Sequence, residues 1–266
     1  MVEYSTLVFE LINYTGPYSV PIVSSLCNEA GSRTYTINNR VTAGLFRPAR
    51  SLHLSMQLPQ TLILQSPIGR LSLISPPPEG DEEATVALRT HPKVLEHLKI
   101  LPDRLTVEDV TTRAKQRLAD PRLLDFSAYL TKGADGKREL IGVAGYFNLD
   151  TVNQSCEVGI LVRPDLHGKQ YATEILYVVL HHIFNTEKLH RITFETASSN
   201  GAMRGWLERT AGARLECQRR DAWRINDGTF VDVAGYAMLA DEWHDKVEPR
   251  LRKRLEMGVD SKEKSN

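Results

Sequence analysis

Cysteine is scarce in this chain of 266 residues, which holds only Cys27, Cys156 and Cys217. The three are far apart and odd in number, which fits a reducing compartment better than a disulfide framework. No C-x-x-C pair or clustered Cys/His spacing occurs, so we expect no metal site. No apolar run approaches the ~20 residues that a membrane-spanning helix needs, so we expect no membrane partner.

The chain also lacks a net charge, because Lys+Arg and Asp+Glu balance at 33 each. Nothing in this balance favours nucleic acid or an acidic membrane surface as a partner. Nothing repeats at a fixed period. With 41% hydrophobic residues, the chain has enough apolar material for one sizeable core.

Acidic residues are absent from Ala30 to Pro78, although arginine is frequent there. This basic, Ser-rich composition is typical of an organelle transit peptide, but the segment does not start at Met1, and Glu3 and Glu10 precede it. We therefore expect residues 1–68 to form an N-terminal extension, partly disordered or packed on the domain. We expect a cytoplasmic protein, with a mitochondrial location as the alternative.

The most informative stretch is a predicted strand, turn and helix in direct succession. The β-branched run Val158, Ile160 and Val162 ends at Arg163-Pro164, and the turn 167–170 follows. Such a joint presents free backbone N–H groups and the positive end of a helix dipole to an anion such as pyrophosphate. The joint is also the commonest one in α/β proteins, so a purely structural role is the alternative. The helix is predicted from apolar residues on one face, at Ala172, Ile175, Leu176, Val179, Leu180, Ile183 and Phe184.

Read in full, this stretch resembles the acetyl-CoA-binding core of the GNAT superfamily of N-acetyltransferases, in particular its RimJ/RimL-like branch. Members of that branch read E-hG-hhh-P-xxx-GKGhATEAL, and this chain reads E-VG-ILVRP-DLH-GKQYATEIL. The likeness continues at His190-Arg191-Ile192, at Asn200, at 228–243 and upstream at 69–89, and it covers about 69–245.

The resemblance implies an α/β fold with a central mixed β-sheet flanked by helices. It places a GNAT-like domain at 69–245, before a charged C-terminal helix and tail at 246–266. It implies an acetyl-CoA-dependent N-acetyltransferase, with acetyl-CoA as co-substrate and a small amine or peptide N-terminus as acceptor, by direct attack on the thioester. The implied cofactor-binding residues are Ile160, Leu161 and Val162 for the pantetheine arm, His167, Gly168, Lys169, Gln170, Tyr171, Ala172 and Thr173 for the pyrophosphate, and Asn200.

Three positions depart from the family pattern. His167 stands where Gln or Arg is usual, and Gln170 stands where Gly is usual. Gln170 would be strained if the backbone there needs a positive φ. Leu207 replaces the Tyr that many members use as general acid. These departures favour the alternative function, a non-catalytic acyl-CoA-binding module.

For catalysis we expect Glu157, at the start of the central strand, to be the general base, because a carboxylate beside apolar strands can have a raised pKa. A strand-edge carboxylate paired with an arginine is the alternative. Tyr236 is the candidate acid, although an aromatic residue in a strand is usually core. Cys156 points to the opposite face from Glu157 and is interpreted as core.

Patterning predicts further elements on both sides of this stretch. We expect helices from about 81, at 94–100 and at 106–118, and strands at 126–131 and 140–149 joined by a Gly-containing turn at 133–136. We expect acceptor specificity to come from 94–118, 140–149 and the loop 220–231. The acids that could favour a cationic amine are Glu108 and Asp109, or Asp221 and Asp227.

Overall fold

The computed structural model describes residues 23–27, 33–37, 61–131 and 138–263. The chain divides into two units, Met1–Met56 and Gln57–Asn266. In the first unit, β1 (Val23–Cys27) and β2 (Arg33–Ile37) form an antiparallel pair. The rest of the expected extension up to residue 60, and the expected turn at 133–136, lie outside the described residues. Within the described part of the chain, no helix is long and apolar enough to cross a membrane.

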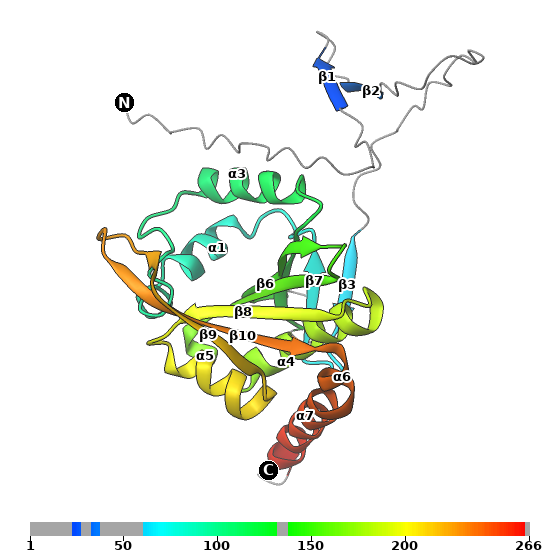
Figure 1. Ribbon diagram of the computed structural model, residues 1–266. Helices are drawn as coiled ribbons and strands as arrows, with labels where there is room; N and C mark the ends of the chain where they lie inside the picture. The colour runs from blue at the N-terminus through cyan, green and yellow to red at the C-terminus, as the bar shows by residue number, and fades with distance from the viewer. Residues whose placement is uncertain (1–22, 28–32, 38–60, 132–137, 264–266) are drawn as a thin grey trace, which may run out of the picture. The chain divides into compact units, whose positions relative to one another are not determined.

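The second unit is built on an eight-stranded sheet with the order β3-β4-β5-β6-β7-β8-β10-β9 (Figure 1). Neighbouring strands are antiparallel except β7 and β8, which are parallel. The sheet is therefore mixed, as predicted. The strands are β3 (Leu62–Gln65), β4 (Leu71–Ser75), β5 (Leu124–Thr131), β6 (Arg138–Asp150), β7 (Ser155–Val162), β8 (Arg191–Ala197), β9 (Arg214–Arg224) and β10 (Phe230–Leu239).

Helices follow the strands in the order that the patterning predicts. The regular helices are α1 (Glu82–Arg89), α2 (Pro92–Leu95), α3 (Val107–Leu118), α4 (Tyr171–His181), α5 (Gly201–Gly205), α6 (Ala240–Glu242) and α7 (Glu248–Glu263). There is also a 3₁₀ turn, η1 (Pro164–Leu166), and three π-helical segments, η2 (His182–Thr186), η3 (Trp206–Ala211) and η4 (Trp243–Val247). The helix expected at 94–100 is shorter and earlier than predicted, because Pro92 starts it and the His91 ring caps it through Lys93 N (3.2 Å).

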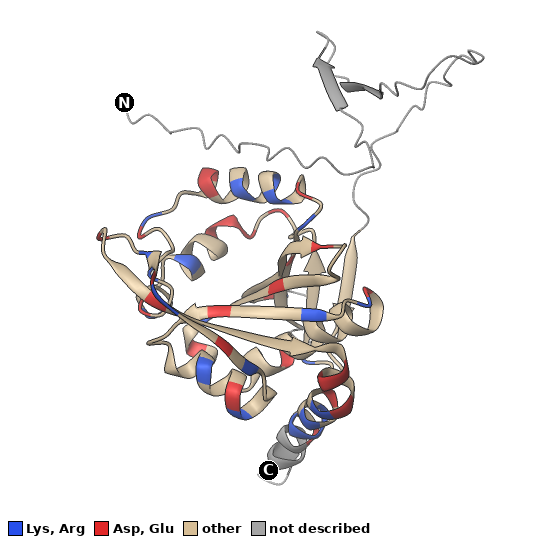
Figure 2. Ribbon diagram, viewed as in Figure 1, with Lys and Arg blue, Asp and Glu red and all other residues tan. Residues whose placement is uncertain are grey.

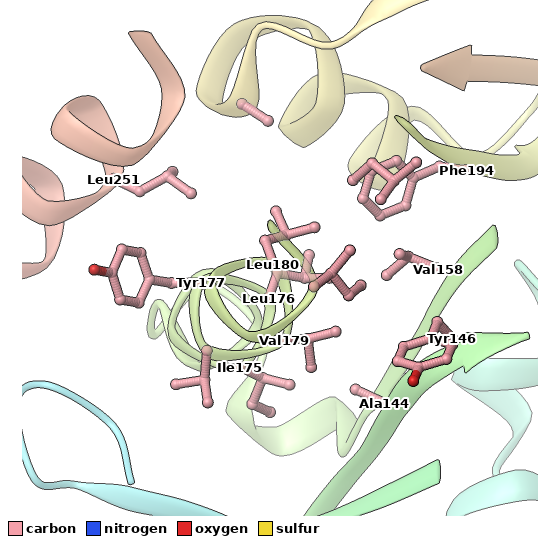
Figure 3. Packing of buried hydrophobic residues seen from close by; sticks show 14 of the residues in the cluster. Ala144, Tyr146, Val158, Ile175, Leu176, Tyr177, Val179, Leu180, Phe194 and Leu251 are labelled. Atoms are coloured by element: carbon pink, nitrogen blue, oxygen red, sulfur yellow. The ribbon is translucent and has the colours of Figure 1, made fainter. Parts of the chain in front are cut away.

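One face of the sheet is packed against α4. Side chains two residues apart share a face, so Ala144 and Tyr146 of β6 lie with Val158 of β7 and Phe194 of β8 (Figure 3). Leu176 and Leu180 of α4 meet this face and are almost fully buried. Truncating such a side chain, as in Leu176→Ala, typically costs ~2–5 kcal/mol. This face is the core, and the chemistry must lie elsewhere.

The first turn of α4 is tied to the edge of the sheet by a buried ion pair. Glu174 is completely buried, and its carboxylate accepts bonds from the Ser66 hydroxyl and from Arg70 Nε (2.8 Å). The Arg70 guanidinium also lies over the Tyr171 ring, 4.6 Å from its centroid. The turn between β3 and β4 therefore fixes where α4 begins.

The edge strand β3 lies upstream of the expected domain start at residue 69. It pairs with β4 from Leu62↔Ser75 to Gln65↔Ser72. A four-residue strand inside an acid-free, Ser-rich segment has little sequence signal of its own, because its order comes from the pairing partner. The unit that holds the sheet accordingly begins at Gln57.

Candidate active site

The two parallel strands at the centre of the sheet separate along their length. Registered pairs between β7 and β8 end at Glu157↔Thr193, although β7 continues to Val162 and β8 to Ala197. On its other side, β7 stays paired with β6 as far as Gly142↔Val162. The backbone of β7 beyond Glu157 therefore faces β8 across an opening in the ladder. Backbone N–H and C=O groups along such an opening can bind a ligand that carries amides of its own.

The loop after β7 turns sharply into α4 through two residues with positive φ. Gly168 has φ +75, and a Cβ there would meet nothing within 4 Å, so its surroundings are open. Gln170, the N-cap of α4, has φ 66 and ψ 2, the left-handed conformation that favours glycine. The backbone thus has a conformation that glycine adopts most readily, and Gln170 adopts it with a full side chain.

The side chains from His167 to Thr173 differ in what they contact. The His167 Nε2–H donates to the carbonyl of Val162 (3.0 Å), which closes the loop onto the end of β7. The buried Oε1 of Gln170 has no hydrogen-bond partner among the described residues. Gly168 and Lys169 are exposed, whereas Thr173 is buried and its hydroxyl accepts from Trp206 Nε1 (3.0 Å). What the loop can offer a phosphate is its exposed turn, the free amides of the first turn of α4, and the Lys169 charge.

The opposite face of the sheet borders a cavity of about 990 Å³. Its floor holds residues of β5, β6, β7 and β8, and its walls are α1, α3 and the segment 98–105. The predicted acceptor regions 94–118 and 140–149 contribute to it, and so does Trp223. The loop predicted at 220–231 is shorter than expected, because β9 continues to Arg224 and β10 begins at Phe230. Ile160, Leu161 and Asn200 also line it, whereas Val162 and 167–173 lie outside the lining.

Glu157 lies in this cavity at the point where β7 and β8 separate. It is half-buried, and its Oε2 accepts one hydrogen bond from Asn148 Nδ2 (3.2 Å). Burial, and next the negative charge of Glu195, raise the pKa of Glu157, while the bond from Asn148 and the charge of Arg219 oppose this. A carboxylate with a raised pKa is a stronger base once ionised, as general-base catalysis requires. Among the described residues, Glu157 forms no ion pair with an arginine; Arg219, whose charge acts on Glu157, is paired with Glu195.

Asn200 follows β8, the strand that borders the opening opposite β7. Its Oδ1 accepts from Met203 N (3.1 Å) as the N-cap of α5, and its Nδ2 donates to the Thr196 hydroxyl (3.0 Å). Both side-chain atoms thus have protein partners, and they hold the end of β8 against α5.

The hydroxyl of Tyr236 is held by two neighbouring side chains. Tyr236 is almost fully buried in β10, its hydroxyl donates to Glu208 Oε1 (2.5 Å), and it accepts from Arg204 Nε (2.9 Å). Burial, and next the bond to Glu208, raise the pKa of Tyr236. Tyr236 is not among the residues that line the cavity. Leu207, at the family's usual acid position, is fully buried.

Sequence reasoning did not single out several residues of the cavity. Glu195 faces Glu157 because β8 brings it there, and Phe147 covers Gly159, whose Cβ would lie 3.2 Å from the Phe147 ring. Arg89 and Arg113 were also missed. The spacing of Arg113 and Arg117, one helical turn apart, is the signal that could have indicated a basic face on α3.

Among the described residues, no group of three or more His, Cys, Asp or Glu side chains could hold a metal ion. Residues 70–212, more than half of the chain, match the sequence family described as Acetyltransferase (GNAT) domain. The chain therefore belongs to the GNAT acetyltransferase family. The opening between β7 and β8 and the positive-φ loop before α4 fit the acetyl-CoA or CoA that this family uses.

One curated relative and several solved structures are similar to the chain. A Bacillus subtilis (strain 168) protein named "Putative ribosomal N-acetyltransferase YdaF" is 30% identical over 104 residues, which is 39% of this chain. The matched region spans about half, 56%, of that relative's length. A GCN5-related N-acetyltransferase from Brucella melitensis aligns with TM-score 0.60 at 20% identity, over 73% of this chain and 86% of that one. Spermidine N-acetyltransferase from Vibrio cholerae, solved with CoA and spermine, aligns with TM-score 0.57 at 19% identity, over 66% and 99%. At these identities the structural likeness shows the fold.

Proposed function

We propose that this chain is an acetyl-CoA-dependent N-acetyltransferase of the RimJ/RimL-like branch, which transfers an acetyl group to a primary amine by direct attack on the thioester. The observation that carries the proposal is the position of Glu157. It lies in a cavity large enough for an acceptor, where β7 and β8 separate. The relative named as a ribosomal N-acetyltransferase supports a peptide N-terminus as acceptor, and the structure solved with spermine supports an amine.

Each part of the site has a separate task in this proposal. The backbone of β7 from Val158 to Val162 aligns the pantetheine arm and the acetyl carbonyl by strand-like hydrogen bonds. The turn at Gly168 and the first amides of α4 bind the pyrophosphate. Holding the two reactants together in this way can supply several kcal/mol of the barrier. When bound, acetyl-CoA supplies the activated acyl group.

Glu157 removes the proton that would otherwise keep the amine from attacking. An amine of pKa ~10 is mostly charged at neutral pH, so a base must accept its proton directly or through a water. Leu207 supplies no acid for the departing sulfur. A thiol of pKa ~8.5 leaves as a thiolate without much assistance near neutral pH, so the missing acid does not prevent transfer.

The second candidate is a non-catalytic acyl-CoA-binding module. It is favoured by the side chain at Gln170, by Leu207, and by a Tyr236 hydroxyl that already has two partners.

Thiol release from acetyl-CoA, measured with the full chain and a panel of peptides and small amines, separates the two candidates. If the chain is an enzyme, the rate of thiol release should depend on the amine and should fall ~10²–10⁴-fold in Glu157→Gln. The matched control is Glu216→Gln, because Glu216 is exposed on the edge strand β9. Acetyl-CoA binding without turnover on any amine would establish the module instead.

A further inference from the structure

Three guanidinium groups meet at one end of the cavity. Arg89 ends α1, and Arg113 and Arg117 lie one turn apart on α3, which packs beside α1. All three line the cavity. Figure 2 shows the basic residues of α3 following its acidic first turn, so positive charge gathers toward the C-terminal half of this helix. We call Arg89, Arg113 and Arg117 the arginine cluster.

Only one carboxylate among the described residues is bonded to this cluster. Asp125 accepts two bonds from Arg117, one from Nε to Oδ2 and one from Nη2 to Oδ1 (2.7 Å), a bidentate arrangement. Three other acids that line the cavity have partners outside the cluster: Asp109 accepts from Thr106 (2.7 and 2.8 Å), Asp81 accepts from Tyr129, and Glu82 accepts from Gly80 N (2.9 Å). Asp125 therefore bonds Arg117 alone, and its single negative charge acts on all three guanidinium groups, so the cluster with Asp125 keeps a net positive charge.

Within the arginine cluster, Arg89 has a hydrogen-bond donor that is not used. Its Nε is buried and has no hydrogen-bond partner among the described residues. Burial, and next the repulsion from Arg113 and Arg117, lower the pKa of Arg89 to about 10, so it still carries its charge at neutral pH. Buried donors and charges normally have partners, because leaving them without one is costly. An anion bound here would provide the missing acceptor.

The register of the sheet sets the distance from the cluster to Glu157. Asp125 of β5 is opposite Gly145 of β6, which is opposite Gly159 of β7, and Glu157 lies two residues from Gly159. Two strand spacings and two residues of rise place the Asp125 and Glu157 backbones ~12 Å apart. The Phe147 ring lies over Gly159, and the Leu124 carbonyl fills the space beside Gly145, so the lining between Asp125 and Glu157 is the Phe147 ring and backbone. An extended peptide covers this span in about three residues.

We propose that the cavity selects acceptors that carry a carboxylate roughly 10 Å from the reacting amine, as in a peptide with an acidic side chain at its second or third residue. This proposal rests on the proposed function and names its substrate class. The amine lies at Glu157, the peptide extends through the cavity past the Phe147 ring, and the carboxylate bonds Arg89 and Arg113. Polyamines are disfavoured, since they would bring positive charge against the arginine cluster.

Thiol release with matched hexapeptides tests the proposal. The peptides share an Ala N-terminus and differ only at residue two or three, which is Glu, Gln or Lys. Losing a charged hydrogen-bond pair corresponds to a ~10- to 100-fold loss in kcat/KM. We therefore expect kcat/KM for the Glu peptide to exceed that for the Gln peptide by this factor, and kcat/KM for the Lys peptide to be lower than that for the Gln peptide. Arg113→Gln should abolish most of this preference through KM. The matched control Arg122→Gln should keep it, because Arg122 is exposed, bonds Asp120 and lies outside the cavity lining.

The possible results distinguish failure of the carboxylate selection from failure of the proposed acetyltransferase function. Turnover that is equal on Glu and Gln peptides, or best on Lys peptides or spermidine, overturns the carboxylate selection and leaves the acetyltransferase intact. If no amine is turned over, calorimetry of the Glu peptide against the wild-type chain and Arg113→Gln decides. Weaker binding to the variant supports the anion site, and equal or undetectable binding overturns it. Because Arg113 is exposed, we expect Arg113→Gln to fold, so the test holds even if Arg89→Gln does not fold.

Discussion

Replacing Gln170 by glycine should stabilise the protein and leave acetyl-CoA affinity almost unchanged. Gln170 has φ 66. We expect the free protein to have the same loop conformation, so that any strain cancels from the binding equilibrium. Relief of a left-handed non-Gly residue contributes ~1–2 kcal/mol, and the added freedom of glycine in the unfolded chain opposes it by ~0.4–1 kcal/mol. Removing the unpartnered buried Oε1 adds to the gain.

The net gain is about 1 kcal/mol, or a rise in Tm of ~2–4 °C for a domain of this size. Calorimetric melting measures the stability, and titration calorimetry measures the acetyl-CoA affinity. Lys188→Gly is the matched control, because Lys188 has φ 57, is exposed, and lies outside the α4 loop. It should gain less, since it has no unpartnered buried atom to remove. Affinity that rises about five-fold in Gln170→Gly without a gain in Tm would refute the reasoning, because strain would then arise only on binding.

Four further predictions concern the loop, the domain boundary, the base and the first turn of α4. Gly168→Val should weaken acetyl-CoA binding in calorimetry, because a β-branched residue resists φ +75 and fills the approach to the loop; unchanged affinity would remove the loop from the site. A chain that starts near Met56 should fold and keep its thiol-release rate, because the sheet-bearing unit begins at Gln57, whereas insolubility would show that the preceding residues are needed. Glu157→Gln should lower kcat ~10²–10⁴-fold at constant acetyl-CoA affinity, and the loss should shrink as pH approaches the pKa of the amine. Glu174→Ala should cost ~3–5 kcal/mol in denaturant melts by leaving Arg70 without its partner; a cost below ~1 kcal/mol would show that this ion pair is not what holds α4.

The sequence predicted the elements that have strong local signals. The run from Val158 to Val162 predicted the central strand, and the apolar stripe of α4 predicted the helix after it. The helix predicted at 106–118 is α3, which starts at a capping box formed by Thr106 and Asp109. The positive φ that was considered for Gln170 is also present. Each of these depends on residues within a few positions of one another, which is what periodicity and capping rules can detect.

What could not be predicted depends on pairs that are far apart in the chain. The bond from Arg70 to Glu174 joins residues 104 positions apart, and the charge of Glu195 reaches Glu157 only because β8 lies beside β7. The partners of the Tyr236 hydroxyl likewise come from α5 and η3. Such contacts are set by sheet order and register, which single-sequence patterns do not specify.

The surroundings of Glu157 in the cavity have opposite effects on catalysis and on the stability of the fold. Because the pKa of Glu157 is raised in the folded state, the native protein holds more protons there than the unfolded chain above the ordinary value of 4.5. Stability is therefore lost as pH rises from that value through the folded-state pKa, since its slope with pH follows the protons bound when unfolded minus those bound when native. Activity follows the opposite direction, because only the ionised carboxylate accepts a proton. The burial and the neighbouring Glu195 that make Glu157 a better base thus oppose folding at neutral pH. Glu157→Gln should then lose turnover while its free energy of unfolding at pH 7 stays level or increases. A merely structural carboxylate, held by an arginine, would show the reverse: lower stability at pH 7 with turnover retained.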